Sequence, residues 1–275
     1  MIKVATIAGS DASGGAGLEA DLKTFEEYGL YGMAAVTVIA TMDPANSWSH
    51  SVFAIPEEEL RKQMETIFTG VGVDACKSGM LGTEYAVDLA REYITKYKIE
   101  NYVLDPVMAC KGANQPLNPE LNKAMAEKLV PLAKVVTPNL FEAQQISGLP
   151  SVATIEEMEE AAKIIVEKGA KSVYIKGGSK LASSASTKKA VDLFYDGNNF
   201  GYIDSPLIDT SWTHGAGCTT AAAIASGLAR GLEPKDAVIL AKKFITQSLS
   251  ASWQLNQYVG PGNPSSYRSK KALFE

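Results

Sequence analysis

Short runs of β-branched and apolar residues alternate along the chain with segments whose apolar residues recur every three or four positions. The runs predict buried strands, and the spacing predicts helices with one apolar face. This alternation is typical of an α/β fold in which a central, mostly parallel sheet is flanked by helices on both faces. In the first half we expect strands at 2–8, 33–40, 75–78, 101–104 and 134–137, and helices at 18–28, 56–68, 83–97 and 119–129.

The second half continues the pattern with one departure. Thr154, with Glu157 three residues later, forms a capping box that predicts the start of a helix ending at residue 169. Two short β-rich runs around the turn at 196–199 predict an antiparallel hairpin. We find no repeat or compositional break and therefore expect residues 1–275 to form a single domain. The other elements expected here are a strand at 172–175 and helices at 218–230 and 234–253.

Charge and cysteine content limit the class of partner. The net charge of −5 and the pI near 5.3, with scattered basic residues, argue against nucleic acid and anionic membranes. Three cysteines, Cys76, Cys110 and Cys218, lack the spacing of a disulfide framework or a zinc site. We find no export signal and no apolar stretch as long as a membrane span. We therefore expect a soluble, cytoplasmic protein with Cys76, inside a predicted strand, in its core.

Glycines surround a thiol where the helix at 218–230 is predicted to begin, in the stretch Thr213-His-Gly-Ala-Gly-Cys218. Glycines let a ligand approach the backbone closely, and the free N–H groups of a helix N-terminus favour an anion such as phosphate. A thiol at that position suggests group transfer. Taken alone, such a stretch is more often the end of a loop, with Cys218 packed as a small apolar residue.

Polar clusters follow five of the predicted strands. Each cluster alone is typical of an ordinary turn. Ligands of parallel sheets, however, bind beyond the carboxyl ends of the strands, so five clusters at that edge favour a binding site over five unrelated turns. The clusters are Ser10-Asp11, Ser78-Gly79-Met80, Asp105-Pro106-Val107, Thr137-Pro138-Asn139 and Lys176-Gly177-Gly178.

Together these motifs resemble the ribokinase superfamily, and within it the branch of hydroxymethylpyrimidine and pyridoxal kinases. The resemblance implies a ribokinase-like fold and ATP-dependent phosphorylation of a hydroxymethyl group on a small heteroaromatic ring. Relatives of this type are commonly dimers, so we expect a homodimer. The motifs keep the family's order over nearly the whole chain: Gly9-Ser-Asp11 with Gly14-Gly-Ala-Gly17-Leu-Glu-Ala-Asp21, Lys77-Ser-Gly-Met-Leu-Gly82, Asp105-Pro-Val107, Val136-Thr-Pro-Asn139-Leu-Phe-Glu142, Lys176-Gly-Gly178 and His214-Gly-Ala-Gly-Cys-Thr219.

The resemblance assigns phosphoryl transfer to the glycine-rich stretch. Gly215, Ala216 and Gly217 would form an anion hole for the transferred phosphoryl group. Cys218 stands where the superfamily usually has an aspartate base, as it does in the branch that the chain resembles. A helix N-terminus can lower a thiol pKa, whereas an incoming phosphate would raise it. Cys218 therefore either accepts the substrate proton or only orients the hydroxyl group, and we favour the proton acceptor.

The resemblance also implies where the nucleotide and the metal bind. Asn139 and Glu142 match the Asn-x-x-Glu motif, whose carboxylate supports Mg²⁺, usually through water. Asp105 is a second acidic group for the metal or phosphate, and no Walker-type phosphate loop is present. Lys188 would reach a phosphate, although a solvated loop lysine is an equal alternative. The residues expected around ATP are Asn139, Lys176, Gly177, Gly178, Ser179, Lys188, Thr213 and Gly217.

Two departures bear on the substrate. Hydroxymethylpyrimidine kinases of this branch carry an Ala-Gln-Asn-Thr run where this chain has Ala40-Thr-Met-Asp-Pro44, so the glutamine that would bind the pyrimidine is missing. Cys110 lies in a segment that resembles a substrate lid, and some pyridoxal kinases of the branch have a lid thiol that adds to the aldehyde of pyridoxal. A structural cysteine is the alternative. The expected ring contacts are Ser10, Asp11, His50, Met80 and Val107.

The resemblance thus favours transfer of phosphate from ATP, with Mg²⁺, to the 5′-hydroxymethyl group of pyridoxal, pyridoxine or pyridoxamine. Hydroxymethylpyrimidine or its phosphate is the alternative substrate. A sensor that binds a vitamin or a nucleotide without catalysis is the alternative class. The intact Gly-Ala-Gly-Cys and Asn-to-Glu motifs argue against such a sensor.

Overall fold

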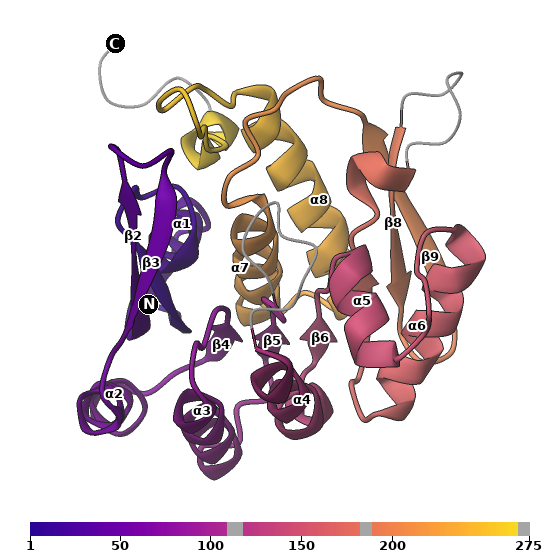
Figure 1. Cartoon of the computed structure of the whole chain (residues 1–275). Helices are drawn as coiled ribbons and strands as arrows, with labels where there is room; N and C mark the ends of the chain where they lie inside the picture. The colour runs from indigo at the N-terminus through magenta and orange to yellow at the C-terminus, as the bar shows by residue number, and fades with distance from the viewer. Residues whose placement is uncertain (109–117, 182–188, 269–275) are drawn as a thin grey trace.

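The computed structural model describes residues 1–108, 118–181 and 189–268, and its described strands form one nine-stranded sheet (Figure 1). The strands are β1 Lys3–Asp11, β2 Tyr31–Asp43, β3 Ser49–Ala54, β4 Ala75–Ser78, β5 Tyr102–Leu104, β6 Val135–Val136, β7 Val173–Ile175, β8 Lys189–Tyr195 and β9 Phe200–Pro206. Their order is β3-β2-β1-β4-β5-β6-β7-β8-β9. The six adjacent strands β2, β1, β4, β5, β6 and β7 run parallel to one another. The outer strands β3, β8 and β9 pair antiparallel with their neighbours.

Helices cover both faces of this sheet, which confirms the predicted fold class. They are α1 Gly17–Glu27, α2 Glu57–Met64, α3 Glu84–Lys96, α4 Pro119–Lys128, α5 Leu140–Ser147, α6 Ile155–Glu167, α7 Ala216–Ala229 and α8 Pro234–Ser250. The α1, α7 and α8 helices pack together on one face, and α2 to α6 cover the other (Figure 1). None of the helices in the described ranges is both long enough and apolar enough to cross a membrane.

The central strands are apolar on both faces because each face is covered by helices. In β5, Tyr102 and Leu104 face the α2–α6 layer, whereas Val103 faces the layer of α1, α7 and α8. All three side chains are fully buried. Cys76 on β4 is equally buried, as predicted for a core residue. This double burial explains why short apolar runs were enough to predict the strands.

The sequence analysis missed one strand, β3, and one α-helix, α5. Every residue of β3 is exposed, so the strand has no alternation of buried and exposed positions to reveal it. The α5 helix has only eight residues and begins at the capping box formed by Asn139 and Glu142, which were interpreted above only as a nucleotide and metal motif. The helix predicted at 56–68 is α-helical to Met64 and continues as a π-helix over Glu65–Val71. The Thr154–Glu157 capping box and the hairpin of β8 and β9 are confirmed.

Candidate functional site

A pocket of about 350 Å³ opens at the carboxyl ends of the parallel strands. The ends of β1, β4, β5 and β7, the β2–β3 hairpin and the first turns of α5 and α7 form its wall. All five predicted ring-contact residues line it: Ser10, Asp11, His50, Met80 and Val107. Polar strand ends that are distant in sequence therefore meet in one concavity, as ligand sites of parallel sheets do.

Asp11 joins the end of β1 to the segment before α7. Its Oδ2 atom lies 2.6 Å from Nε2 of His214 and accepts a hydrogen bond from the Ala16 N–H at 2.9 Å. Its Oδ1 atom accepts a hydrogen bond from the Ser13 N–H at 2.8 Å. Burial opposes ionisation, but the His214 and Ser13 hydrogen bonds outweigh it and lower the pKa of Asp11 to about 2. Asp11 is therefore a firmly held carboxylate.

His214 lines the same pocket and was not among the predicted site residues. Its position directly before Gly-Ala-Gly-Cys was the available signal. The partner that holds it, Asp11, lies 203 residues away in sequence, so the pairing has no local signature.

The first turn of α1 fixes the backbone of the strand end. The Ser10 hydroxyl donates to Oε1 of Glu19 at 2.6 Å, and the Asp11 N–H donates to Oε2 at 2.8 Å. Gly17, at φ 59°, lies so close to β1 that an added Cβ would stand 2.3 Å from the Gly9 carbonyl oxygen. The Ser10 oxygen keeps its lone pairs for a ligand, because its own proton is already donated.

Gly215 and Gly217 differ in what the backbone requires of them. Gly215, the N-cap of α7, has φ 76°, and an added Cβ would meet the Gly15 carbonyl oxygen at 1.9 Å. At Gly217 an added Cβ would come no closer than 3.5 Å to Nζ of Lys176. The fold therefore requires glycine at 215, whereas at 217 the missing side chain leaves space on the pocket side.

The N–H groups at the start of α7 are not equally available. The Ala216 N–H donates to the Thr213 carbonyl at 3.2 Å within the loop. Helix geometry leaves the N–H groups of Gly217 and Cys218 for a ligand. Thr213, Gly215, Ala216, Gly217 and Cys218 all line the pocket, so the predicted glycine-rich stretch lies at the site as a unit.

Burial raises the pKa of Cys218 to about 11, although Lys77 opposes the shift. The carboxylates of Asp105 and Asp21 add to the rise. Desolvation and nearby negative charge therefore outweigh the opposing effect of Lys77. A pKa of about 11 keeps the Cys218 thiol protonated at neutral pH.

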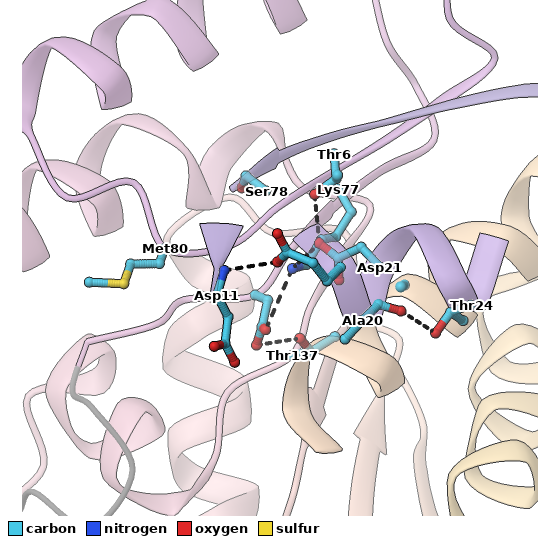
Figure 2. Close-up of polar contacts among 12 residues, drawn as sticks. Thr6, Asp11, Ala20, Asp21, Thr24, Lys77, Ser78, Met80 and Thr137 are labelled. Atoms are coloured by element: carbon cyan, nitrogen blue, oxygen red, sulfur yellow. Dashed lines mark hydrogen bonds and ion pairs between the residues drawn. The ribbon is translucent and has the colours of Figure 1, made fainter. Parts of the chain in front are cut away.

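A chain of buried charges runs beneath the pocket. Nζ of Lys77 lies 2.9 Å from Oδ2 of Asp21 (Figure 2). The same ammonium lies 4.0 Å from Oδ2 of Asp105. Lys176 reaches Oδ1 of Asp105 at 3.2 Å. Thr6 donates to Oδ2 of Asp21 at 2.6 Å. Alternating ammonium and carboxylate groups thus connect α1, β4, β5 and β7 under the first turn of α7.

Lys77 was quoted within a motif but not predicted as a site residue. It belongs to β4 and is fully buried, yet it contributes to the pocket wall. A lysine inside a strand predicted to be buried was the available signal, because a buried charge needs a partner.

Asn139 and Glu142 are held by their reciprocal hydrogen bonds. Oε2 of Glu142 accepts from the Asn139 N–H at 2.8 Å, and Oδ1 of Asn139 accepts from the Glu142 N–H at 2.9 Å. Burial raises the pKa of Glu142 to about 7, although Lys176 opposes the shift. The four residues expected near phosphate and metal all line the pocket: Asp105, Glu142, Asn139 and Lys176.

The donor set in this region suits a cation that brings its own ligands. Within the described ranges, no three His, Cys, Asp or Glu side chains gather as a metal site. Glu142 and Asp105 offer carboxylate oxygens, and Mg²⁺ typically combines one or two carboxylates with phosphate oxygens and water. The two residues therefore fit Mg²⁺ as an ion shared with a nucleotide.

The remaining predicted residues lie beside the pocket or outside the described residues. Gly177 and Gly178 follow β7 and do not contribute to the pocket wall, and Ser179 lies in the short 3₁₀ helix Gly178–Leu181. Cys110 and Lys188 lie outside the described residues.

One wall of the pocket comes from the β2–β3 hairpin. Met42 and His50 are directly paired across the two strands, as are Ala40 and Val52, and all four line the pocket. Met42 and Val52 were missed because β3 was not predicted. Apolar side chains therefore surround His50 on this wall.

The comparisons with known proteins agree with this geometry. The sequence model of a protein family described as phosphomethylpyrimidine kinase matches residues 11–263 of this chain. The pyridoxine kinase of Bacillus subtilis is 53% identical over 268 residues, covering 98% of this chain and 97% of that protein. The solved ADP complex of Bacillus subtilis pyridoxal kinase has a TM-score of 0.92 at 53% identity, covering 97% of this chain and 98% of that chain. The solved structure of Staphylococcus aureus pyridoxal kinase in complex with AMP-PCP and pyridoxal has a TM-score of 0.90 at 47% identity. The match covers 97% of this chain and 94% of that chain.

Proposed function

The chain belongs to the phosphomethylpyrimidine kinase family, and on that premise we propose that it transfers the γ-phosphoryl group of ATP to the 5′-hydroxymethyl group of pyridoxal, pyridoxine and pyridoxamine. The observation that carries the proposal is that one pocket is lined both by the start of α7, with Cys218, and by the predicted ring contacts Met80 and Val107. The 53% identity to a pyridoxine kinase supports the substrate class. The continuous nine-stranded sheet supports one kinase domain over the whole chain.

Phosphoryl transfer needs a proton acceptor and a site for negative charge. The N–H groups of Gly217 and Cys218, with Gly215 and Ala216 shaping the turn, would stabilise the charge that gathers on the transferred group. The substrate oxygen forms its bond to the γ-phosphorus while the bond to ADP breaks, and the hydroxyl proton passes to the Cys218 thiolate. Because the thiol is protonated at rest, it must first release its own proton to solvent, and the positive charge of nearby Lys77 favours the resulting thiolate.

Two substitutions separate this role from simple orientation of the hydroxyl group. Cys218→Ala should abolish turnover and leave ADP binding largely intact, whereas Cys218→Asp should retain turnover, because a carboxylate also accepts a proton. Near-normal turnover by Cys218→Ala would contradict the assignment of Cys218 as the proton acceptor. An inactive Cys218→Asp variant that still binds ADP would favour a thiol that only orients.

The nucleotide and the metal would occupy the side of the pocket nearest α5 and β7. Glu142 and Asp105 would hold Mg²⁺, which would neutralise phosphate charge when bound. The carboxylate chemistry of these two residues and their position in the pocket support this assignment. The roles of Lys188 at a phosphate and of Cys110 at the substrate aldehyde stay predictions. The residues proposed around ATP are Asn139, Lys176, Gly177, Gly178, Ser179, Lys188, Thr213 and Gly217.

The opposite side would hold the vitamin ring. Met80 and Val107 supply apolar faces, and Ser10, Asp11 and His50 supply polar contacts. Cys110 would add to the aldehyde of pyridoxal as a hemithioacetal. Ala40 and Met42 of β2 line the pocket in the stretch where a pyrimidine kinase would be expected to present a glutamine, which supports a B6 vitamer over hydroxymethylpyrimidine.

We also propose a homodimer and a cytoplasmic location. Ile39 and Phe53 are paired across β2 and β3 with 40% and 58% of their surfaces exposed. They alternate with the pocket-lining pair Ala40 and Val52, so they point to the other face of the hairpin. An exposed apolar pair at a sheet edge supports burial against a second copy. Light scattering of the wild-type protein and of Phe53→Glu tests the dimer. The cytoplasm supplies ATP and keeps the Cys218 thiol reduced.

One assay separates the candidate functions. ADP release is measured with pyridoxal, pyridoxine, pyridoxamine and hydroxymethylpyrimidine, with Cys218→Ala as the inactive control. Activity on the three B6 vitamers supports the proposal. Activity on hydroxymethylpyrimidine alone would overturn the substrate, and nucleotide binding without activity on any of them would favour a sensor.

A further inference from the structure

A second buried polar cluster lies away from the pocket, between β8 and α8. Oδ2 of Asp192 accepts hydrogen bonds from Nζ of Lys242 at 2.6 Å and from the Tyr174 hydroxyl at 2.5 Å. Asp192, Lys242 and Tyr174 are 4%, 7% and 1% exposed. None of the three lines the pocket or was singled out from the sequence.

The other oxygen of Asp192 reaches the proposed nucleotide segment. Oδ1 accepts a hydrogen bond from the Gly178 N–H at 3.1 Å. Gly178 has φ 55°, a left-handed conformation that glycine adopts readily. A single buried carboxylate thus holds the backbone of the loop that follows β7.

The same loop is fixed at two further points. The Lys176 N–H donates to the Pro138 carbonyl at 2.8 Å, which ties its first residue to the end of β6. An added Cβ at Gly177 would stand 2.3 Å from the Val191 carbonyl oxygen, so the loop lies directly against β8. Contacts from both sides therefore define the path of the segment from Lys176 to Gly178.

Stability alone is a weak explanation for this cluster. Replacing a buried ion pair with well-packed apolar groups is often neutral or stabilising. An acceptor aimed at a loop N–H does what an apolar pair cannot do, because it fixes the orientation of that peptide. Gly178 follows Lys176 by two residues, so the orientation of this peptide also sets the path of the backbone that carries the Lys176 ammonium.

We propose that Asp192 is a positioning residue for nucleotide binding, with Lys242 compensating its buried charge. This inference rests on the proposed function, in which Lys176, Gly177 and Gly178 contact ATP. Asp192 acts through the loop backbone and touches no substrate itself. It should therefore affect the nucleotide and not the vitamin.

Two double variants isolate the hydrogen bond from the charge. Asp192→Asn/Lys242→Met is neutral and keeps an oxygen acceptor for the Gly178 N–H, whereas Asp192→Leu/Lys242→Met is neutral and lacks one. We expect the leucine variant to raise the KM for ATP and the Kd of ADP, measured by calorimetry, roughly tenfold. We expect the asparagine variant to stay within roughly twofold of wild type, with the KM for pyridoxal unchanged in both. Tyr174→Phe, which removes only a bond to Oδ2, should leave ADP affinity intact.

The outcomes decide the inference separately from the function. An unchanged Kd of ADP in a folded leucine variant, or an equal loss in both double variants, would overturn it. If the leucine variant does not fold, the Gly178 amide of the wild-type protein still tests it by hydrogen exchange without nucleotide: protection is expected, and exchange at the rate of an open loop would overturn it. Wild-type inactivity on every vitamer would overturn the proposed substrate, while ADP titration would still test the role of Asp192.

Discussion

Nζ of Lys77 lies 2.9 Å from Oδ2 of Asp21, and neither side chain exposes any surface to solvent. The pair connects β4 to α1 directly beneath the pocket. Oδ1 of Asp21 is buried and has no hydrogen-bond partner among the described residues. An ion pair in this environment costs more to break than it contributes when intact, because removal of one partner strands the other charge away from water.

Lys77→Met should therefore lower the free energy of unfolding by about 3–5 kcal/mol. Urea denaturation at pH 7 measures the change. Lys62→Met is the matched control, because Lys62 pairs with Glu58 at 2.6 Å while 68% of its side chain is exposed. Exposed pairs contribute less than about 1 kcal/mol, so equal effects of the two substitutions would contradict this account.

Removing both charges should recover much of that loss. In Lys77→Met/Asp21→Leu no uncompensated charge remains buried, so the double variant should unfold at a higher urea concentration than Lys77→Met alone. A double variant less stable than the single one would show that packing, and not charge, sets the cost.

Gly215→Ala and Gly217→Ala should separate folding from function. Alanine at 215 would force a Cβ to within 1.9 Å of the Gly15 carbonyl oxygen at a φ of 76°, so we expect a loss of at least about 2 kcal/mol in unfolding free energy. Alanine at 217 meets only the end of Lys176 at 3.5 Å. This variant should keep wild-type stability in thermal denaturation but lose ATP turnover, since its methyl group occupies the ligand side. Normal turnover by Gly217→Ala would contradict the anion-hole assignment.

Local signals were visible in the sequence, and long-range pairings were not. The capping box of Thr154 lies within four residues, and the apolar runs of the central strands are continuous, so periodicity and spacing were enough to predict them. Lys77 pairs with a carboxylate 56 residues away, and His214 with one 203 residues away, so neither contact leaves a local pattern. The motifs therefore predicted which strand ends meet, whereas the charges that hold them required the three-dimensional structure.

Asp11 should make stability depend on acid pH. Its pKa of about 2 in the folded protein lies below the ordinary value of 3.8, so its contribution is present above pH 4 and is lost as the pH falls toward 2. The shift corresponds to about 2 kcal/mol. Asp11→Asn should therefore be less stable than wild type in urea at pH 6, and the difference should shrink at pH 3. A constant difference across this range would contradict the assignment. Asp204→Asn, at an exposed pair with Lys189, should change stability little.

Cys218 should react with an alkylating agent only as the pH rises well above neutral. Iodoacetamide attacks the thiolate, and a pKa of about 11 predicts a rate that increases roughly tenfold per unit between pH 7 and pH 10. Mass spectrometry of the peptide that contains Cys218 measures this rate apart from the other thiols, and fully buried Cys76 should stay unmodified while the protein is folded. A rate that is already constant from pH 7 upward would show that the helix N-terminus and Lys77 outweigh burial. In that case the thiolate would be the resting form, ready to accept the substrate proton without a prior deprotonation.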